Sequence, residues 1–147
     1  HLNMKIAIGN DHAGTLLKQG ILELLQLHNH TVINVGTNTD ESVDYPDFAH
    51  HVAHLVANNE VDSGIVVCGS GNGVNITVNK YAQVRSALCW TTEIAALARQ
   101  HNDANVIAIP ARFVSQELAL EMIEVFLNTA FEGGRHQKRV EKIAPVK

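Results

Sequence analysis

The stretch Gly64-Ile65-Val66-Val67-Cys68-Gly69-Ser70-Gly71-Asn72-Gly73 joins an uninterrupted apolar run to a turn with three alternating glycines. A continuous apolar run of this length is typical of a parallel strand that is buried on both faces. A glycine-rich turn after such a strand is typical of a junction with a following helix. Because parallel strands need crossover connections, usually helices, this stretch decides the fold class.

The same alternation continues on both sides of this stretch. Short apolar runs predict four further strands, and apolar residues at helical spacing predict the helices between them. Such alternation is typical of βαβ units with right-handed crossovers. We therefore predict an α/β fold, a three-layer α/β/α sandwich with a Rossmann-like parallel sheet of about five strands. The further strands are expected at 5–8, 31–35, 84–89 and 105–109, and a polar loop is expected at 36–47, with Asp47 capping the next helix.

Length and composition indicate one ordinary globular domain. The chain has 147 residues, of which 46% are hydrophobic and 18% charged. Residues 1–3 precede Met4 and are interpreted as a remnant of cloning, which leaves 4–147 as a single domain. No apolar run approaches the length of a membrane span, and no secretory signal is recognised. We expect a cytoplasmic protein without a membrane partner.

The charge is distributed unevenly. The formal net charge of -4 argues against a general grip on nucleic acid. The C-terminal tail is nevertheless basic, and Arg135 and Arg139 are four residues apart on an expected tail helix, so both can hold one phosphate. A merely solvated charged face is the alternative. If the tail crosses onto a partner subunit, these arginines and Arg112 would form a site at a dimer interface. The tail cations are Arg135, Lys138, Arg139, Lys142 and Lys147.

Ligands of open parallel sheets bind at the carboxyl ends of the strands. The glycines after Cys68 let successive backbone N–H groups turn toward an anion, which predicts an oxyanion or phosphate cradle. The spacing fits neither the dinucleotide fingerprint nor the P-loop. A tight turn without a ligand is the alternative. Other residues that follow strands are Asn10, Asp11, His12, Trp90, Thr91, Pro110 and Arg112.

The two cysteines receive different interpretations. Cys68 stands at a strand end beside the cradle, where a thiolate is stabilised and acts as a base or nucleophile. Cys89 lies inside an expected strand and is interpreted as an inert small hydrophobe. A disulfide framework or a four-ligand zinc site is not expected from two distant cysteines.

Nine histidines raise the question of a metal site. His50 and His54 fall opposite the apolar stripe of their predicted helix, so we expect them to be solvated and predict no metal. His12 follows a strand end, and His101 closes a helix just before the fifth strand. Both are placed to reach the crevice, or else to lie at the surface.

Several ordered motifs carry a resemblance to a known family. From Met4 to Ile143 the chain resembles the family of ribose-5-phosphate isomerase B, galactose-6-phosphate isomerase and allose-6-phosphate isomerase. The motifs are Gly9-Asn10-Asp11-His12-Ala13-Gly14, Asp44-Tyr45-Pro46, Cys68-Gly69-Ser70-Gly71-Asn72-Gly73, Asn79-Lys80, Arg99-Gln100-His101-Asn102-Asp103-Ala104-Asn105 and Glu132-Gly133-Gly134-Arg135-His136-Gln137.

The resemblance implies interconversion of ribose 5-phosphate and ribulose 5-phosphate, without metal or cofactor, in a homodimer or a dimer of dimers with shared active sites. It implies that Cys68 moves the proton between carbons 1 and 2 through a cis-enediolate, with the Ser70 hydroxyl near the reacting oxygens. His101, from the neighbouring subunit, would open the sugar ring. The substrate-binding residues that it implies are Asp11, His12, Tyr45, Gly69, Ser70, Gly71, Asn72, Gly73, Asn102, Arg112, Arg135 and Arg139.

Two other functions are kept as hypotheses. Asn10 and Asn72 depart from residues common in the family, which motivates a hexose 6-phosphate such as allose 6-phosphate as substrate. The sheet pattern and the glycine loop also fit a flavodoxin-like module that binds a flavin or nucleotide.

Overall fold

The computed structural model describes residues 3–146. Two of the three residues interpreted as a cloning remnant, and Lys147 of the basic tail, lie outside this range. No helix of the described part is long and apolar enough to cross a membrane. The elements are β1 (Lys5–Asn10), the short 3-10 helix η1 (His12–Gly14), α1 (Thr15–Leu27), β2 (Thr31–Asn34), α2 (Tyr45–Ala57), β3 (Ser63–Cys68), α3 (Asn72–Val78), β4 (Ser86–Leu88), α4 (Thr92–Asn102), β5 (Val106–Pro110), α5 (Gln116–Asn128) and α6 (Arg135–Val140).

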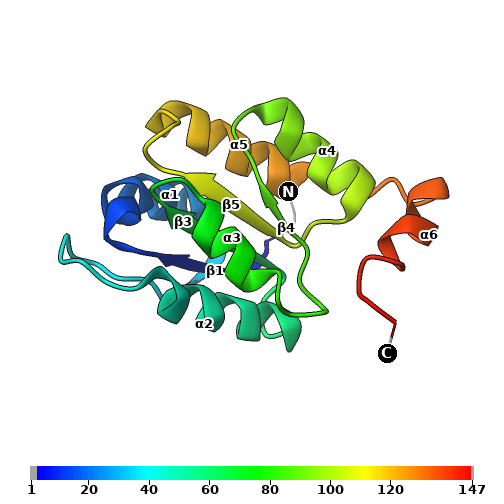
Figure 1. The fold of residues 1–147 in the computed structure, drawn as a ribbon. Coiled ribbons are helices and arrows are strands. Elements are labelled where there is room, and N and C mark those ends of the chain that lie inside the picture. Colours follow the sequence, from blue (N-terminus) through cyan, green and yellow to red (C-terminus); the bar gives the residue numbers. More distant parts are fainter. Residues whose placement is uncertain (1–2, 147) are drawn as a thin grey trace.

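The five strands form one parallel sheet in the order β2-β1-β3-β5-β4. Helices α2 and α3 cover one face, and α1, α4 and α5 cover the other (Figure 1). The predicted three-layer α/β/α sandwich is confirmed. The apolar run that decided the fold class is the central strand β3, and all six of its residues are buried.

Side chains of β3 alternate between two cores. Ile65 and Val67 belong to the core beneath α1, α4 and α5. Val66 and Cys68 belong to the core beneath α2 and α3. Since successive side chains of a strand point to opposite faces, the position of Cys68 in the register directs its thiol toward the α2 and α3 layer.

Strand boundaries differ from the predicted ones by one or two residues, and two boundary differences bear on candidate residues. Helix α2 begins at Tyr45 rather than after Asp47, and Asp44 takes the N-cap position. The reason is Pro46, which lies within the expected loop. Its fixed φ and missing N–H suit the first turn of a helix, so the helix begins before this proline rather than after it. Strand β4 ends at Leu88, so Cys89 lies just beyond it, although its N–H still donates to the Ala108 carbonyl at 3.1 Å.

Candidate active site

Three loops meet at the carboxyl edge of the sheet, where β1, β3 and β5 end. The Asp11 N–H donates to the Val67 carbonyl at 3.2 Å. The Ala111 N–H donates to the Cys68 carbonyl at 2.9 Å, and the Arg112 N–H to the Gly69 carbonyl at 3.0 Å. These backbone bonds hold the three loops side by side, so the residues that follow the three strands share one site.

Cys68 is the last residue of β3, and its side chain is nearly covered, with 5% of the residue exposed. The chain then turns sharply at Gly71, which has a φ of 75°. A Cβ there would lie 2.5 Å from Leu88 Cδ1 and 3.1 Å from the Pro110 nitrogen. Only glycine satisfies both the left-handed conformation and this close approach. The glycine turn therefore packs against the end of β5.

Tyr45 and Arg112 border the glycine loop on two sides. A Cβ on Gly73 would lie 2.4 Å from Tyr45 Cε1, and one on Gly69 would lie 3.1 Å from Arg112 Nη1. The absence of side chains at these two glycines thus lets a phenol ring and a guanidinium approach the loop backbone. One group of side chains and backbone amides therefore surrounds the glycine loop. It consists of the Cys68 thiol, the loop amides, the Tyr45 phenol and the Arg112 guanidinium.

Asp11 and His12 complete this group on the β1 side. Asp11 Oδ1 accepts a hydrogen bond from the Ala13 N–H at 3.0 Å and so caps the short helix η1. His12 Nδ1 accepts one from the Val43 N–H at 3.2 Å. An accepting Nδ1 leaves the proton of the neutral ring on Nε2. In the glycine loop, Ser70 Oγ accepts from the Asn72 N–H at 3.3 Å, which fixes the exposed hydroxyl.

His101 and Asn102 lie at the opposite edge of the sheet from Cys68. Helix α4 starts beyond the carboxyl end of β4 and ends at Asn102, before the amino end of β5. In Figure 1 the arrowhead of β5 points away from the end of α4 and from α6. A crossover helix runs antiparallel to the strands it connects, so its last turn returns to the amino edge. His101 therefore lies away from the crevice of its own chain, contrary to the expectation that it reaches this crevice.

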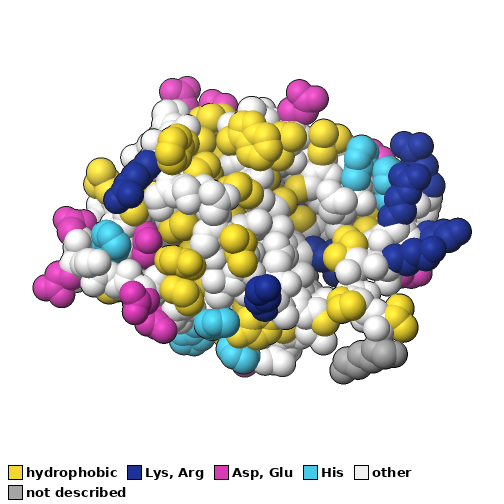
Figure 2. Space-filling view, viewed as in Figure 1, with side chains coloured by type: hydrophobic (Ala, Val, Ile, Leu, Met, Phe, Trp, Pro, Cys, Tyr) yellow, Lys and Arg dark blue, Asp and Glu magenta, His cyan; other side chains and the backbone are white. Residues whose placement is uncertain are grey.

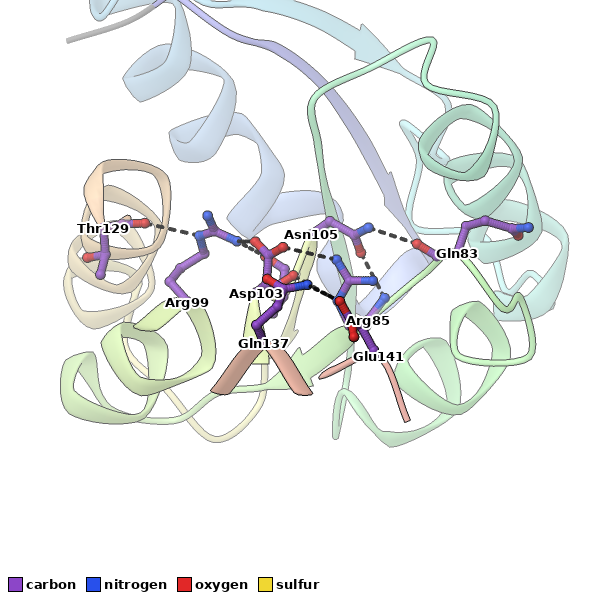
Figure 3. A network of polar contacts seen from close by, with 9 residues as sticks. Gln83, Arg85, Arg99, Asp103, Asn105, Thr129, Gln137 and Glu141 are labelled. Atoms are coloured by element: carbon purple, nitrogen blue, oxygen red, sulfur yellow. Dashed lines mark hydrogen bonds and ion pairs between the residues drawn. The ribbon is translucent and has the colours of Figure 1, made fainter. Parts of the chain in front are cut away.

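A polar network fixes the turn that follows Asn102. Asp103 adopts a left-handed conformation with φ 48°. Its carboxylate accepts from Arg99 Nη1 at 3.0 Å and from Arg85 Nη2 at 3.4 Å (Figure 3). Arg85 Nε also donates to the Asp103 carbonyl, and Arg99 Nε to the Thr129 carbonyl. Two guanidiniums thus hold the end of α4 rigidly in place.

The basic tail lies beside this end of α4. Arg135 and Arg139 are exposed on α6, and Figure 2 shows basic side chains gathered at this end of the molecule next to histidines. The rings of His101 and His136 stack, with centroids 4.2 Å apart and planes 14° apart. Burial lowers the pKa of His136 below its ordinary value, and electrostatic interactions with His101 and Arg135 lower it further. The site residues predicted from sequence therefore form two groups at opposite edges.

Two residues of the second group received no role from the sequence. Glu132 Oε1 lies 3.5 Å from His136 Nε2 and 3.9 Å from His101 Nε2. Glu132 and His136 are four residues apart, but Gly133 and Gly134 between them have positive φ, so no helical periodicity marks the pair. The only signal was their presence in the tail motif.

Cys89, His50 and His54 lie outside both groups. Burial raises the pKa of Cys89 to about 12, and its side chain is completely covered. This agrees with an inert apolar residue. His50 and His54 are exposed, as expected, but both contact the Tyr81 hydroxyl, at 2.7 Å from His50 Nδ1 and 3.4 Å from His54 Nε2.

A thiol, a glycine loop and polar groups at the carboxyl edge of a parallel sheet define an α/β enzyme site. The model of the Ribose/Galactose Isomerase family matches residues 6–143. The chain therefore belongs to the ribose/galactose isomerase family, and the predicted family is confirmed.

Relatives and solved structures are similar over nearly the whole chain. Ribose-5-phosphate isomerase B of Escherichia coli (strain K12) is 46% identical over 97% of this chain and 95% of its own. A ribose 5-phosphate isomerase structure from Thermotoga maritima, 43% identical, gives a TM-score of 0.96 over 99% of this chain and 100% of that one. Ribose-5-phosphate isomerase B from Mycoplasma genitalium with bound ribulose-5-phosphate, also 43% identical, gives 0.93 over 98% and 96%.

Proposed function

We propose that this protein interconverts ribose 5-phosphate and ribulose 5-phosphate, with Cys68 as the base. The observation that carries the proposal is the position of the Cys68 thiol at the end of the central strand, beside a glycine loop that Tyr45 and Arg112 border. The similarity to the Mycoplasma genitalium enzyme, whose structure holds ribulose-5-phosphate, supports this choice of substrate.

The reaction needs a base and a group of hydrogen-bond donors. The proton on the carbon next to a carbonyl is weakly acidic, so its removal requires a positioned base and donors where the enediolate charge develops. Cys68 supplies the base, and the backbone N–H groups of 69–73 together with the Ser70 hydroxyl supply the donors. Preorganised donors of this kind each contribute about 3 kcal/mol to transition-state stabilisation.

The phosphate of the substrate gives binding energy through a group that does not react. Arg112, beside Gly69, and His12 lie at the carboxyl edge and act as phosphate or sugar contacts in the proposal. Charge-assisted bonds to a phosphate orient the reacting carbons against the base. Asp11 and Tyr45 contact the sugar.

We further propose that two copies of the chain complete each site. His101, Asn102, Arg135 and Arg139 lie at the amino edge, away from Cys68 of their own chain, so a second copy has to bring them. Large apolar side chains are exposed near the carboxyl edge, which suits contact with that copy: Leu16 and Phe113 are each 76% exposed and Trp90 is 53% exposed. His101 of the second copy then opens the sugar ring.

Two broader features complete the proposal. A single isomerase domain extends over residues 4–147. The protein functions in the cytoplasm, where its two free cysteines stay reduced.

The first test compares Cys68→Ala with Cys89→Ala in an assay of ribose 5-phosphate conversion. We expect Cys68→Ala to lose at least a thousandfold in kcat because it removes the base, and Cys89→Ala to keep its turnover. Full turnover by Cys68→Ala would refute the assigned base.

Allose 6-phosphate is assayed in parallel. Asn10 is one of the two residues that suggested allose 6-phosphate as a substrate. Its side chain is buried, and its Nδ2 donates hydrogen bonds to the Asp11 and Thr37 carbonyls.

The second test mixes two inactive variants. Cys68→Ala and His101→Asn are unfolded together, refolded and assayed with ribose 5-phosphate. If each site takes its cysteine from one chain and its histidine from the other, half of the dimers are mixed and each mixed dimer has one intact site. About a quarter of wild-type activity should return. No recovery, with dimers formed, would mean that one chain supplies both residues.

A further inference from the structure

Three potential metal ligands converge beside the basic tail. The donor atoms of His101, Glu132 and His136 all lie within 4.8 Å of one another. Glu132 Oε1 is 3.5 Å from His136 Nε2 and 3.9 Å from His101 Nε2. Ligands bonded to a tetrahedral zinc ion at about 2.1 Å stand about 3.4 Å apart. The two distances from Glu132 are close to this spacing, so a rotation of the two rings would let the three groups share one ion.

We propose that His101, Glu132 and His136 form a binding site for a divalent transition-metal ion such as Zn²⁺, and that the bound ion takes His101 out of catalysis. Two imidazoles and one carboxylate are a ligand set that zinc uses where its fourth position stays open to water. Imidazole donors favour zinc, cobalt, nickel and copper over magnesium and calcium.

The backbone holds the three ligands in place. His101 belongs to the last turn of α4, which the Arg99 and Arg85 network fixes. The Glu132 N–H donates to the Gln100 carbonyl at 3.1 Å, which ties the tail to that same turn. The His136 N–H donates to the Gly133 carbonyl at 3.0 Å. These contacts fix the backbone at the three ligands, so only their side-chain torsions remain to be ordered when an ion binds.

Two features oppose the ion and limit its affinity. Arg135 and Arg139 are close enough to His136 to disfavour further positive charge there. The stacked rings of His101 and His136 are nearly parallel, so they must turn before their lone pairs meet. We therefore expect weaker binding than at a structural zinc site with four protein ligands.

The catalytic consequence rests on the proposed function. An imidazole nitrogen bonded to a metal ion cannot exchange a proton, so an occupied site stops His101 from opening a sugar ring. Ribose 5-phosphate is mainly a closed ring, whereas ribulose 5-phosphate is an open chain. Zn²⁺ should therefore slow the reaction that starts from ribose 5-phosphate at least about tenfold more than the reaction that starts from ribulose 5-phosphate.

Metal binding is measured without substrate, by titrating the full chain with Co²⁺ and recording the visible absorption of the ion. We expect one Co²⁺ per chain with an intense tetrahedral band that Zn²⁺ displaces. Glu132→Gln and His136→Gln should weaken binding by at least about tenfold. The Glu132 side chain is 51% exposed, so its variant keeps the fold even if His136→Gln does not.

Two control variants address other histidine sites. His28 Nε2 and Glu124 Oε1 are also 3.5 Å apart, but within residues 3–146 no third potential metal ligand joins them in a cluster. His50 and His54 share one exposed helix face. His28→Gln and His54→Gln should bind Co²⁺ as the wild type does. Unchanged binding by Glu132→Gln, or loss of binding in a control, would overturn the site. Binding by a protein that fails to convert ribose 5-phosphate would refute the proposed function and leave the site standing.

Discussion

The ring of Tyr45 occupies the space that a side chain at Gly73 would need. A Cβ on Gly73 would lie 2.4 Å from Tyr45 Cε1 and 2.5 Å from Tyr45 Cζ. Tyr45 starts α2 and Gly73 lies in the first turn of α3, so this contact joins two helices beside the Cys68 loop. Because Tyr45 is 40% exposed, its ring can turn toward solvent. A side chain added at Gly73 should therefore displace the phenol from the site.

Gly73→Ala should therefore raise stability while it lowers activity. Alanine in a helix is favoured over glycine by about 1 kcal/mol, and the tyrosine yields by turning into solvent. We expect a slightly higher melting temperature, with kcat/KM for ribose 5-phosphate about tenfold lower because the phenol would leave the sugar that we propose it contacts. Tyr45→Ala is the matched control: adding Gly73→Ala to it should change kcat/KM little. A further tenfold loss in that background would contradict this account.

Gly71→Ala should be much more damaging than Gly133→Ala. Both glycines have positive φ, 75° and 65°, so alanine costs about 1 to 2 kcal/mol of backbone strain at each. At Gly71 the new Cβ also meets Leu88 Cδ1 at 2.5 Å, whereas Gly133 faces open space. Urea unfolding should show a loss of about 3 kcal/mol or more for Gly71→Ala and about 1 kcal/mol for Gly133→Ala. Equal losses would rule out the steric contribution at Gly71.

Cys68 should react with iodoacetamide well before Cys89. Burial raises the pKa of Cys89 to about 12, so little of its reactive thiolate exists at pH 8, and its side chain is fully covered. Peptide mapping by mass spectrometry during the reaction should find Cys68 modified first, in step with the loss of activity. Cys89 should react only in urea. Early modification of Cys89 in the folded protein would contradict its assignment as an inert core residue.

Lys18→Met should destabilise the loop that follows β2. Lys18 is only 2% exposed, and its ammonium donates to Asn34 Oδ1 at 3.1 Å, to Asn38 Oδ1 at 2.6 Å and to the Thr37 carbonyl. Methionine replaces the side chain as far as Cε but lacks the ammonium. Each of the three acceptors then keeps only its other donor, which is the Gly36 N–H for Asn34, Asn34 Nδ2 for Asn38 and Asn10 Nδ2 for Thr37. The lost bonds to a charged donor should cost about 2 kcal/mol. Chemical denaturation measures the loss, and Lys5→Met on the exposed start of β1 is the control. A Lys18→Met loss no larger than that of Lys5→Met would show that these bonds are dispensable.

His30 should make the fold less stable in mild acid. Its Nδ1 accepts from the Met4 N–H at 3.0 Å, and burial, with a smaller effect of His28, lowers its pKa below the ordinary 6.5. Below pH 6.5 the unfolded chain binds a proton that the folded chain resists, so stability falls as the pH drops toward the lowered pKa.

Urea midpoints at pH 8 and pH 5.5 test this effect. The midpoint of His30→Gln, whose amide oxygen can still accept from Met4, should fall less between the two pH values than that of the wild type. His51→Gln, an exposed control on α2, should follow the wild type. Parallel midpoints for all three proteins would contradict the role of His30.

The sequence by itself determined the sheet, the order of elements and the first half of the site. The apolar run from Ile65 to Cys68 is typical of a strand buried on both faces, and the alternating glycines after it favour a turn, so strand, turn and helix were predicted correctly. Because the carboxyl ends of parallel strands share one edge, the proximity of Asp11, Cys68 and Arg112 was also predictable.

Only the tertiary structure decided where His101 lies relative to Cys68, and which residues surround it. A motif gives the identity of a residue but not the edge of the sheet that a crossover helix returns to. Likewise, Glu132 and His136 meet His101 because two glycines with positive φ fold the tail back against the end of α4. That contact depends on long-range packing, which no local period in the sequence encodes.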